Sequence, residues 1–107
     1  MKKYNKRERK ELRKLSELAY KRELNSAIND LYNKFKEWEK DSIDSFELDH
    51  EIHIYHNGIS RELYKKYNDN DLIDITVGWA IARGILEKSE VSDNLINKLH
   101  LIIERYN

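Results

Sequence analysis

No proline interrupts the 107 residues of this chain, and only three of them are glycine. Proline breaks helices and both residues mark turns, so a chain with so few of them favours long helices joined by short connections. Charged residues make up 37% of the chain and hydrophobic residues 39%, a mixture that suits amphipathic helices. The sequence therefore predicts an all-α fold, an antiparallel bundle of about four helices in one domain.

Helix boundaries follow from the apolar periodicity and from the residues that cap helices. Asn5 and Glu8 have the spacing of a capping box at the start of the first segment. Asp44 and Glu47 repeat this spacing at the second segment, and Ser92 suits the N-cap of the fourth. The predicted segments are 5–40, 45–67, 71–86 and 92–106. The third is apolar nearly all round, which predicts a helix in the middle of the bundle.

The first segment carries two apolar stripes that do not share one side of a helix. At about 100° per residue, the stripe from Leu12 to Ala19 lies about 175° from the stripe that starts at Leu24. One straight helix cannot direct both stripes at one core, so we expect either a break near 25 or a separate partner for residues 5–20. The second alternative makes residues 1–20 a basic helical arm that docks on another chain. Its predicted interaction surface is Leu12, Leu15, Leu18 and Ala19.

The charge of the chain sums to zero but is unevenly distributed. Residues 1–14 hold eight basic side chains against two acidic ones, a net of +6, so the other 93 residues carry −6. A cluster of cations can bind phosphates, which makes nucleic acid an alternative partner. Charge runs are more often simply solvated. The basic residues are Lys2, Lys3, Lys6, Arg7, Arg9, Lys10, Arg13 and Lys14.

Three of the four histidines stand in the second segment. There, helical spacing brings Asp49, His53 and His56 to one strip. Imidazole and carboxylate ligands suit zinc, iron or nickel, so this strip is an alternative metal or enzymatic site. A complete site needs a ligand from another helix, and ordinary surface histidines are the commoner explanation. No nucleophile motif and no glycine-rich phosphate loop accompanies the strip.

The remaining composition limits the environment and the class of function. The chain has no cysteine, no apolar stretch long enough to span a membrane and no secretory leader pattern, so we expect a cytoplasmic protein without a membrane partner. No cofactor is predicted. The expected function is non-catalytic: a small interaction or regulatory domain, adaptor or antitoxin-like, that acts through self-association or a protein partner.

Overall fold

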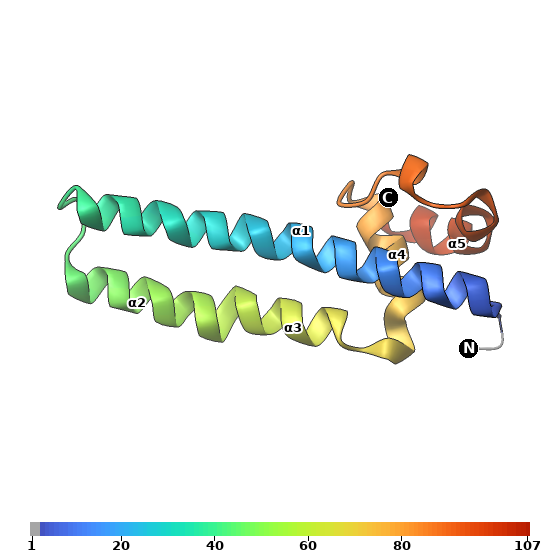
Figure 1. Cartoon of the computed structure of the whole chain (residues 1–107), viewed down its shortest axis with the longest axis horizontal. Helices are drawn as coiled ribbons and strands as arrows, with labels where there is room; N and C mark the ends of the chain where they lie inside the picture. The colour runs from blue at the N-terminus through green and yellow to red at the C-terminus, as the bar shows by residue number, and fades with distance from the viewer. Residues whose placement is uncertain (1–2) are drawn as a thin grey trace.

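The computed structural model describes residues 3–107 and contains four helical rods without a strand among those residues. The predicted all-α antiparallel bundle is confirmed (Figure 1). Its helices are α1 (Lys6–Glu39), α2 (Ser45–Tyr55), α3 (Arg61–Tyr67), α4 (Ile73–Ala82) and α5 (Asp93–Tyr106). A single π-helical turn, η1 (His56–Ser60), joins α2 to α3 into one rod, and short 3-10 turns, η2 (Asn70–Leu72) and η3 (Lys88–Glu90), lie before α4 and α5.

Helix α1 is one unbroken element of 34 residues, about 51 Å long at 1.5 Å per residue. The predicted capping box starts it: Asn5 accepts from the backbone of Glu8, whose side chain accepts from the Asn5 backbone. The helix continues through Asn25 and Ser26, so the predicted break near 25 is wrong. The two apolar stripes instead belong to one straight helix that packs on different neighbours along its length.

The distal half of α1 forms an antiparallel hairpin with the rod made by α2, η1 and α3 (Figure 1). A tight turn reverses the chain after α1, with Asp41 in the left-handed region at φ 60°. The predicted capping box of Asp44 and Glu47 then starts α2. Near the base of the hairpin, the rings of Tyr20 and Tyr67 stack with their centroids 5.1 Å apart.

The π turn changes which side chains of the second rod face α1. Its extra residue rotates everything that follows by about 100° relative to a regular helix. Leu48 before it and Leu63 after it are both buried, whereas Ile59 within it is 40% exposed. The predicted helix over 45–67 is present as one rod, but a regular helix would place Ile59 only about 20° from Leu48, and periodicity alone does not reveal the inserted residue.

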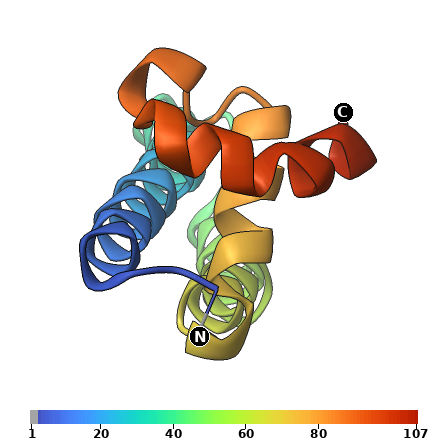
Figure 2. The same cartoon turned by 90° about the vertical axis from the view of Figure 1, so that its right-hand side faces the viewer.

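Helices α4 and α5 cover only the N-terminal half of α1 (Figure 1) and form what we call the head, which Figure 2 shows end-on. The main hydrophobic core lies here, and α4 packs between α1 and α5, as its apolar sequence predicted. The predicted N-cap of α5 is present, because the Ser92 side chain accepts from the backbone of Leu95. The largest fully buried side chains are Tyr4, Leu12, Leu86, Leu95, Leu99 and Val77.

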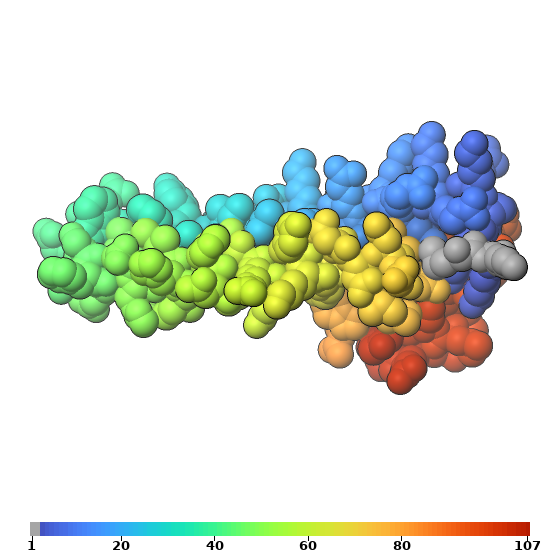
Figure 3. Space-filling view, turned by 90° about the horizontal axis from the view of Figure 1, so that it is seen from below, coloured from blue at the N-terminus to red at the C-terminus, as the bar shows by residue number. Residues whose placement is uncertain are grey.

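The molecule is consequently elongated, with extents of 53 × 24 × 22 Å. Its radius of gyration is 17.3 Å, whereas a compact domain of this length has about 13 Å. The space-filling view shows a narrow hairpin that extends from a wider head (Figure 3). Half of α1 therefore has only a single helical neighbour.

Two glycines of the fold are expected to respond in opposite ways to a methyl group. A Cβ on Gly78 would lie 2.4 Å from the Ile102 side chain at the contact of α4 with α5, so Gly78→Ala is expected to destabilise the head by about 1–3 kcal/mol. A Cβ on Gly58 meets nothing within 4 Å, and Gly58→Ala should raise the free energy of unfolding by about 0.5–1 kcal/mol. Urea titrations of both variants measure the difference. Equal effects would contradict the close packing at Gly78.

Candidate interaction surface

The predicted interaction surface on α1 is not accessible. Leu12 and Ala19 are 0% exposed and Leu15 is 5% exposed, while Leu18 is half-buried against the same core. All four pack on the head of their own chain, so the prediction of an outward-facing surface is wrong, and residues 6–20 form no projecting arm. The physical reason is that α4 and α5 fold back over this half of α1, a long-range contact that sequence periodicity does not reveal.

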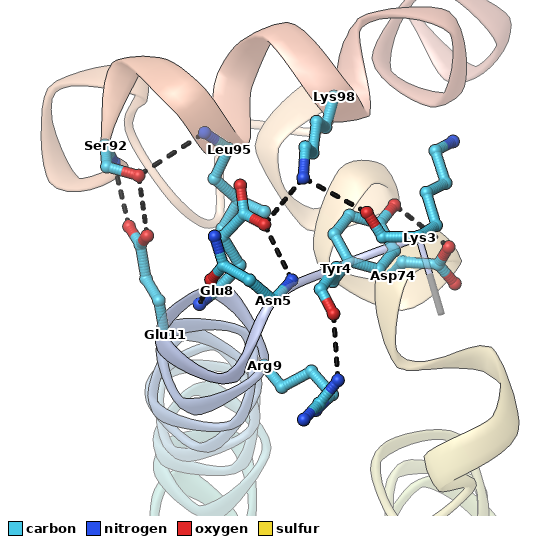
Figure 4. A network of polar contacts seen from close by, with 10 residues as sticks. All are labelled: Lys3, Tyr4, Asn5, Glu8, Arg9, Glu11, Asp74, Ser92, Leu95 and Lys98. Carbon is cyan, nitrogen blue, oxygen red and sulfur yellow. Dashed lines mark hydrogen bonds and ion pairs between the residues drawn. The ribbon is translucent and has the colours of Figure 1, made fainter. Parts of the chain in front are cut away.

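Polar contacts fix the first turn of α1 to the head (Figure 4). Tyr4 is 1% exposed and its hydroxyl donates to the Asp74 carboxylate of α4 at 3.1 Å. The buried Glu8 accepts from the Lys98 ammonium of α5 at 2.7 Å, and this hydrogen bond holds the pKa of Glu8 below its usual value. Burial, with Asp74 nearby, raises the pKa of Tyr4. These contacts close the head at its outer end.

Two further contacts tie α1 to the loop between α4 and α5. The carboxylate of Glu11 accepts from the backbone and hydroxyl of Ser92 at 2.8 and 2.6 Å. The Arg22 guanidinium donates to both carboxylate oxygens of Glu90 at 2.8 and 2.7 Å and also to the Ile85 carbonyl. Arg22, with the Glu87 backbone, lowers the pKa of Glu90 to about 2. The head is thus held by charged pairs as well as by its core.

The predicted basic residues lie on the outside of the head, except Lys2, which lies outside the described residues. Arg9 is half-buried and donates to the Tyr4 carbonyl at 2.9 Å. The others are exposed: Lys3, Lys6, Arg7, Lys10, Arg13 and Lys14. The two acidic residues of the segment, Glu8 and Glu11, are engaged with the head. The outer surface that residues 3–14 form is therefore more basic than the composition of this segment suggests.

The predicted metal strip lies on the exposed surface of the hairpin. The His53 Nε2 and Asp49 Oδ2 atoms are 3.5 Å apart, and both side chains are mostly exposed. His56 lies in the π turn and is also exposed. Within residues 3–107, no group of three His, Asp or Glu side chains is arranged to hold a metal ion. The structure therefore brings two of the three predicted ligands together and supplies no ligand from another helix.

The hairpin exposes a set of large apolar side chains that the sequence did not single out. Between residues 24 and 59 only Ala27 and Leu48 are buried. The exposed ones are Ile28 (47%), Tyr32 (54%), Trp38 (41%), Phe46 (87%), Ile54 (51%) and Ile59 (40%). Single exposed apolar residues are ordinary, but exposed apolar residues that share one face of the molecule mark an interaction site, so their distribution over the two sides of the hairpin matters.

One side of the hairpin is hollowed into a groove beside the head. Two adjoining cavities of about 400 and 240 Å³ share Ala27, Asp30 and Ile59 as lining residues. Ile85 of the head closes the groove at one end. Charged residues from α1 and α2 line it together with the apolar ones, among them Asp30, Lys34 and Glu51.

The opposite side of the hairpin is what we call the open face: Ile28, Tyr32, Phe35, Ile52 and Tyr64. Ile28 and Tyr32 each stand two residues from Asp30, and residues two apart point about 200° apart on a helix. They therefore point away from the groove that Asp30 lines. Tyr64 is 61% exposed and stands two residues before Lys66, whose ammonium contacts Trp79 of the head. The open face consequently lies away from the head.

Comparison of the chain with protein-family models, with curated proteins and with solved structures finds no match. Among the described residues, no helix combines the length and the apolar character that crossing a bilayer requires. The arrangement of the side chains themselves is therefore the basis for a functional proposal.

The contact of Arg22 with Glu90 predicts an acid-sensitive head. The pKa of Glu90 falls from 4.5 to about 2 on folding, so its carboxylate stabilises the fold above about pH 4.5, and this contribution is lost as the pH falls towards 2. Glu90→Gln should destabilise the protein at pH 7 and converge with the wild type near pH 2. Thermal unfolding from pH 7 to 2 measures this, with the exposed Glu62→Gln as control. A constant difference between wild type and Glu90→Gln would contradict it.

Proposed function

We propose that this chain is a non-catalytic protein-interaction module that docks through the open face of its helical hairpin. A helical partner laid on this face would complete the two-helix hairpin as a bundle. The observation that carries the proposal is the contrast between the two halves of α1: the head buries its apolar side chains, whereas the hairpin leaves Ile28 and Tyr32 about half exposed. Surfaces of this kind suit helix-to-helix recognition, in which anchors recur at helical spacing.

The basic end supports a nucleic-acid function less well. Nucleic-acid-binding domains are typically strongly basic, with an isoelectric point above about 9, whereas this chain has one near 6.9. The acidic residues concentrate at the hairpin tip, where seven of them stand against two basic residues between 36 and 51. A phosphate backbone that follows the molecule would meet this negative end. A protein partner that carries both acidic and basic side chains is complementary to both ends of this chain.

A metal or enzymatic function has little support from the same geometry. Asp49 and His53 form an exposed pair, and the described residues offer no third ligand beside it. The two cavities of the groove are lined mainly by apolar and charged side chains. We place the module in the cytoplasm, because its lack of cysteine suits a reducing compartment.

The proposal predicts that docking and folding depend on different residues. Ile28→Glu with Tyr32→Glu should abolish binding to any protein partner, because it places charges in the middle of the apolar face. It should leave helicity and the melting temperature nearly unchanged, since both side chains are already about half exposed. The matched control is Leu101→Glu, at a side chain of α5 that is 77% exposed.

Affinity retention from cell extract, followed by reconstitution with the purified retained protein, measures the difference between these variants, and sedimentation of the pure chain measures self-association. A double variant that still binds as the control does would overturn the open face as the docking site. A chain that neither self-associates nor retains a reconstitutable partner would overturn the proposed function.

A further inference from the structure

We infer that the partner of the open face is a second copy of this chain, placed antiparallel about a two-fold axis near Ile28. The inference rests on the proposed docking function and names its occupant. Three observations support it: the surplus surface of the monomer, the order of side chains along one stripe of α1, and the opposite charges of the two ends of the molecule.

The monomer exposes more surface than a compact chain of its mass. Its accessible surface is 7797 Å², whereas a compact monomer of 13.0 kDa exposes about 6,300 Å². The surplus is about 1,500 Å². A stable protein interface of standard size buries about 800 Å² on each partner, and permanent dimers bury more. Pairing along the hairpin could therefore remove a surplus of the size that a stable dimer buries.

One stripe of α1 runs along the open face and changes character along its length. At about 100° per residue it is centred about 160° from Leu12, Leu15 and Ala19, which pack on the head. It is mostly basic near the head, apolar in the middle, and ends with Glu39 at the tip. In order, its members are Arg7, Lys10, Lys14, Glu17, Lys21, Asn25, Ile28, Tyr32, Phe35 and Glu39; all are exposed except Phe35, which is half-buried.

Reversal of a second copy makes this stripe complementary to itself. The midpoint between Lys14 and Glu39 falls between residues 26 and 27, so a two-fold axis there brings each lysine beside the other copy's glutamate. Ile28 then lies within about 3 Å of the axis along the helix, so the two copies of Ile28 meet there, while Tyr32 lies beside the other copy's Lys21. A parallel arrangement would place like charges opposite each other at both ends.

The ends of the molecule carry the same complementarity. Residues 3–14 hold seven basic and two acidic side chains, a net of +5, and both acidic ones are engaged within the head. Residues 36–51 hold two basic and seven acidic side chains, a net of −5. The two groups lie at opposite ends of the long axis (Figure 1). An antiparallel pair places the basic segment 3–14 beside the acidic segment 36–51 twice, which favours this partner and this direction.

The first test is the mass of the pure chain in solution. Light scattering with sedimentation should give twice the 13.0 kDa chain mass at tens of micromolar. Ile28→Glu with Tyr32→Glu should raise the dissociation constant at least tenfold, whereas Leu101→Glu should not change it, and circular dichroism checks that all variants stay helical. A wild type that remains at 13.0 kDa at all concentrations overturns the dimer. If that monomer still retains a partner through the open face, the proposed function stands without this inference.

The second test addresses the charges. Lys10→Glu with Lys14→Glu reverses the basic end, and Glu39→Lys with Asp49→Lys reverses the acidic end at exposed positions. Each pair alone should raise the dissociation constant about tenfold, because like charges then face each other. All four substitutions in one chain should restore the wild-type value. If reversal of one end has no effect, or if the fourfold variant is as weak as either pair, the antiparallel arrangement is wrong.

The third test determines whether the two copies run antiparallel or parallel. Because the chain has no cysteine of its own, only the introduced cysteines can react. With a short bifunctional thiol reagent, Ile28→Cys should cross-link to itself, because both copies of this position lie near the axis. Glu39→Cys should not cross-link to itself but should do so when mixed with Lys14→Cys. Self-linking of Glu39→Cys in place of the mixed product would indicate a parallel pair and overturn the inference. A gel shift by nucleic acid that Lys10→Glu with Lys14→Glu abolishes, together with a monomeric mass, would assign the basic end to phosphates instead.

Discussion

The mismatch between the length of α1 and the length of its partners determines the rest of the structure. This helix has 34 residues, whereas α4 has 10 and α5 has 14. The head can therefore surround only one half of α1, and the other half extends into solvent with the single rod of α2, η1 and α3 beside it. A two-helix layer buries only one side of each helix, so apolar side chains on the remaining sides stay exposed.

Local features of the fold followed from the sequence because they depend on residues close together in the chain. Both capping boxes, the Ser92 cap and the burial of α4 are of this kind. The break near 25 and the arm of residues 1–20 were wrong for one shared reason. Two stripes on opposite sides of a helix do not require two separate bodies, because α4–α5 and α2–α3 lie on different sides of one straight helix. Periodicity identifies an apolar side, but it does not say which later segment covers it.

The candidate surface was only partly predictable. The number of basic residues in residues 1–14 indicated that they are exposed. The count of charges also showed that the rest of the chain is net acidic. The sequence did not predict where the acidic residues lie in space. The hairpin sets residues 36–51 at the end of the long axis opposite to the basic segment. The open face depends in addition on the π turn, because the position of Tyr64 relative to Ile52 includes its extra residue. A one-residue insertion has no signal in a periodic pattern.

The contacts that close the head also impose an order on synthesis. Lys98 reaches Glu8 across 90 positions of sequence, and Ser92 reaches Glu11 across 81. On the ribosome, Leu12 and Ala19 therefore stay without their covering helix α4, and α4 without α5, while the hairpin of residues 6–67 can already form. The nascent chain thus exposes both sides of α1 before it is complete. A copy that pairs too early could use the stripe that the finished molecule buries.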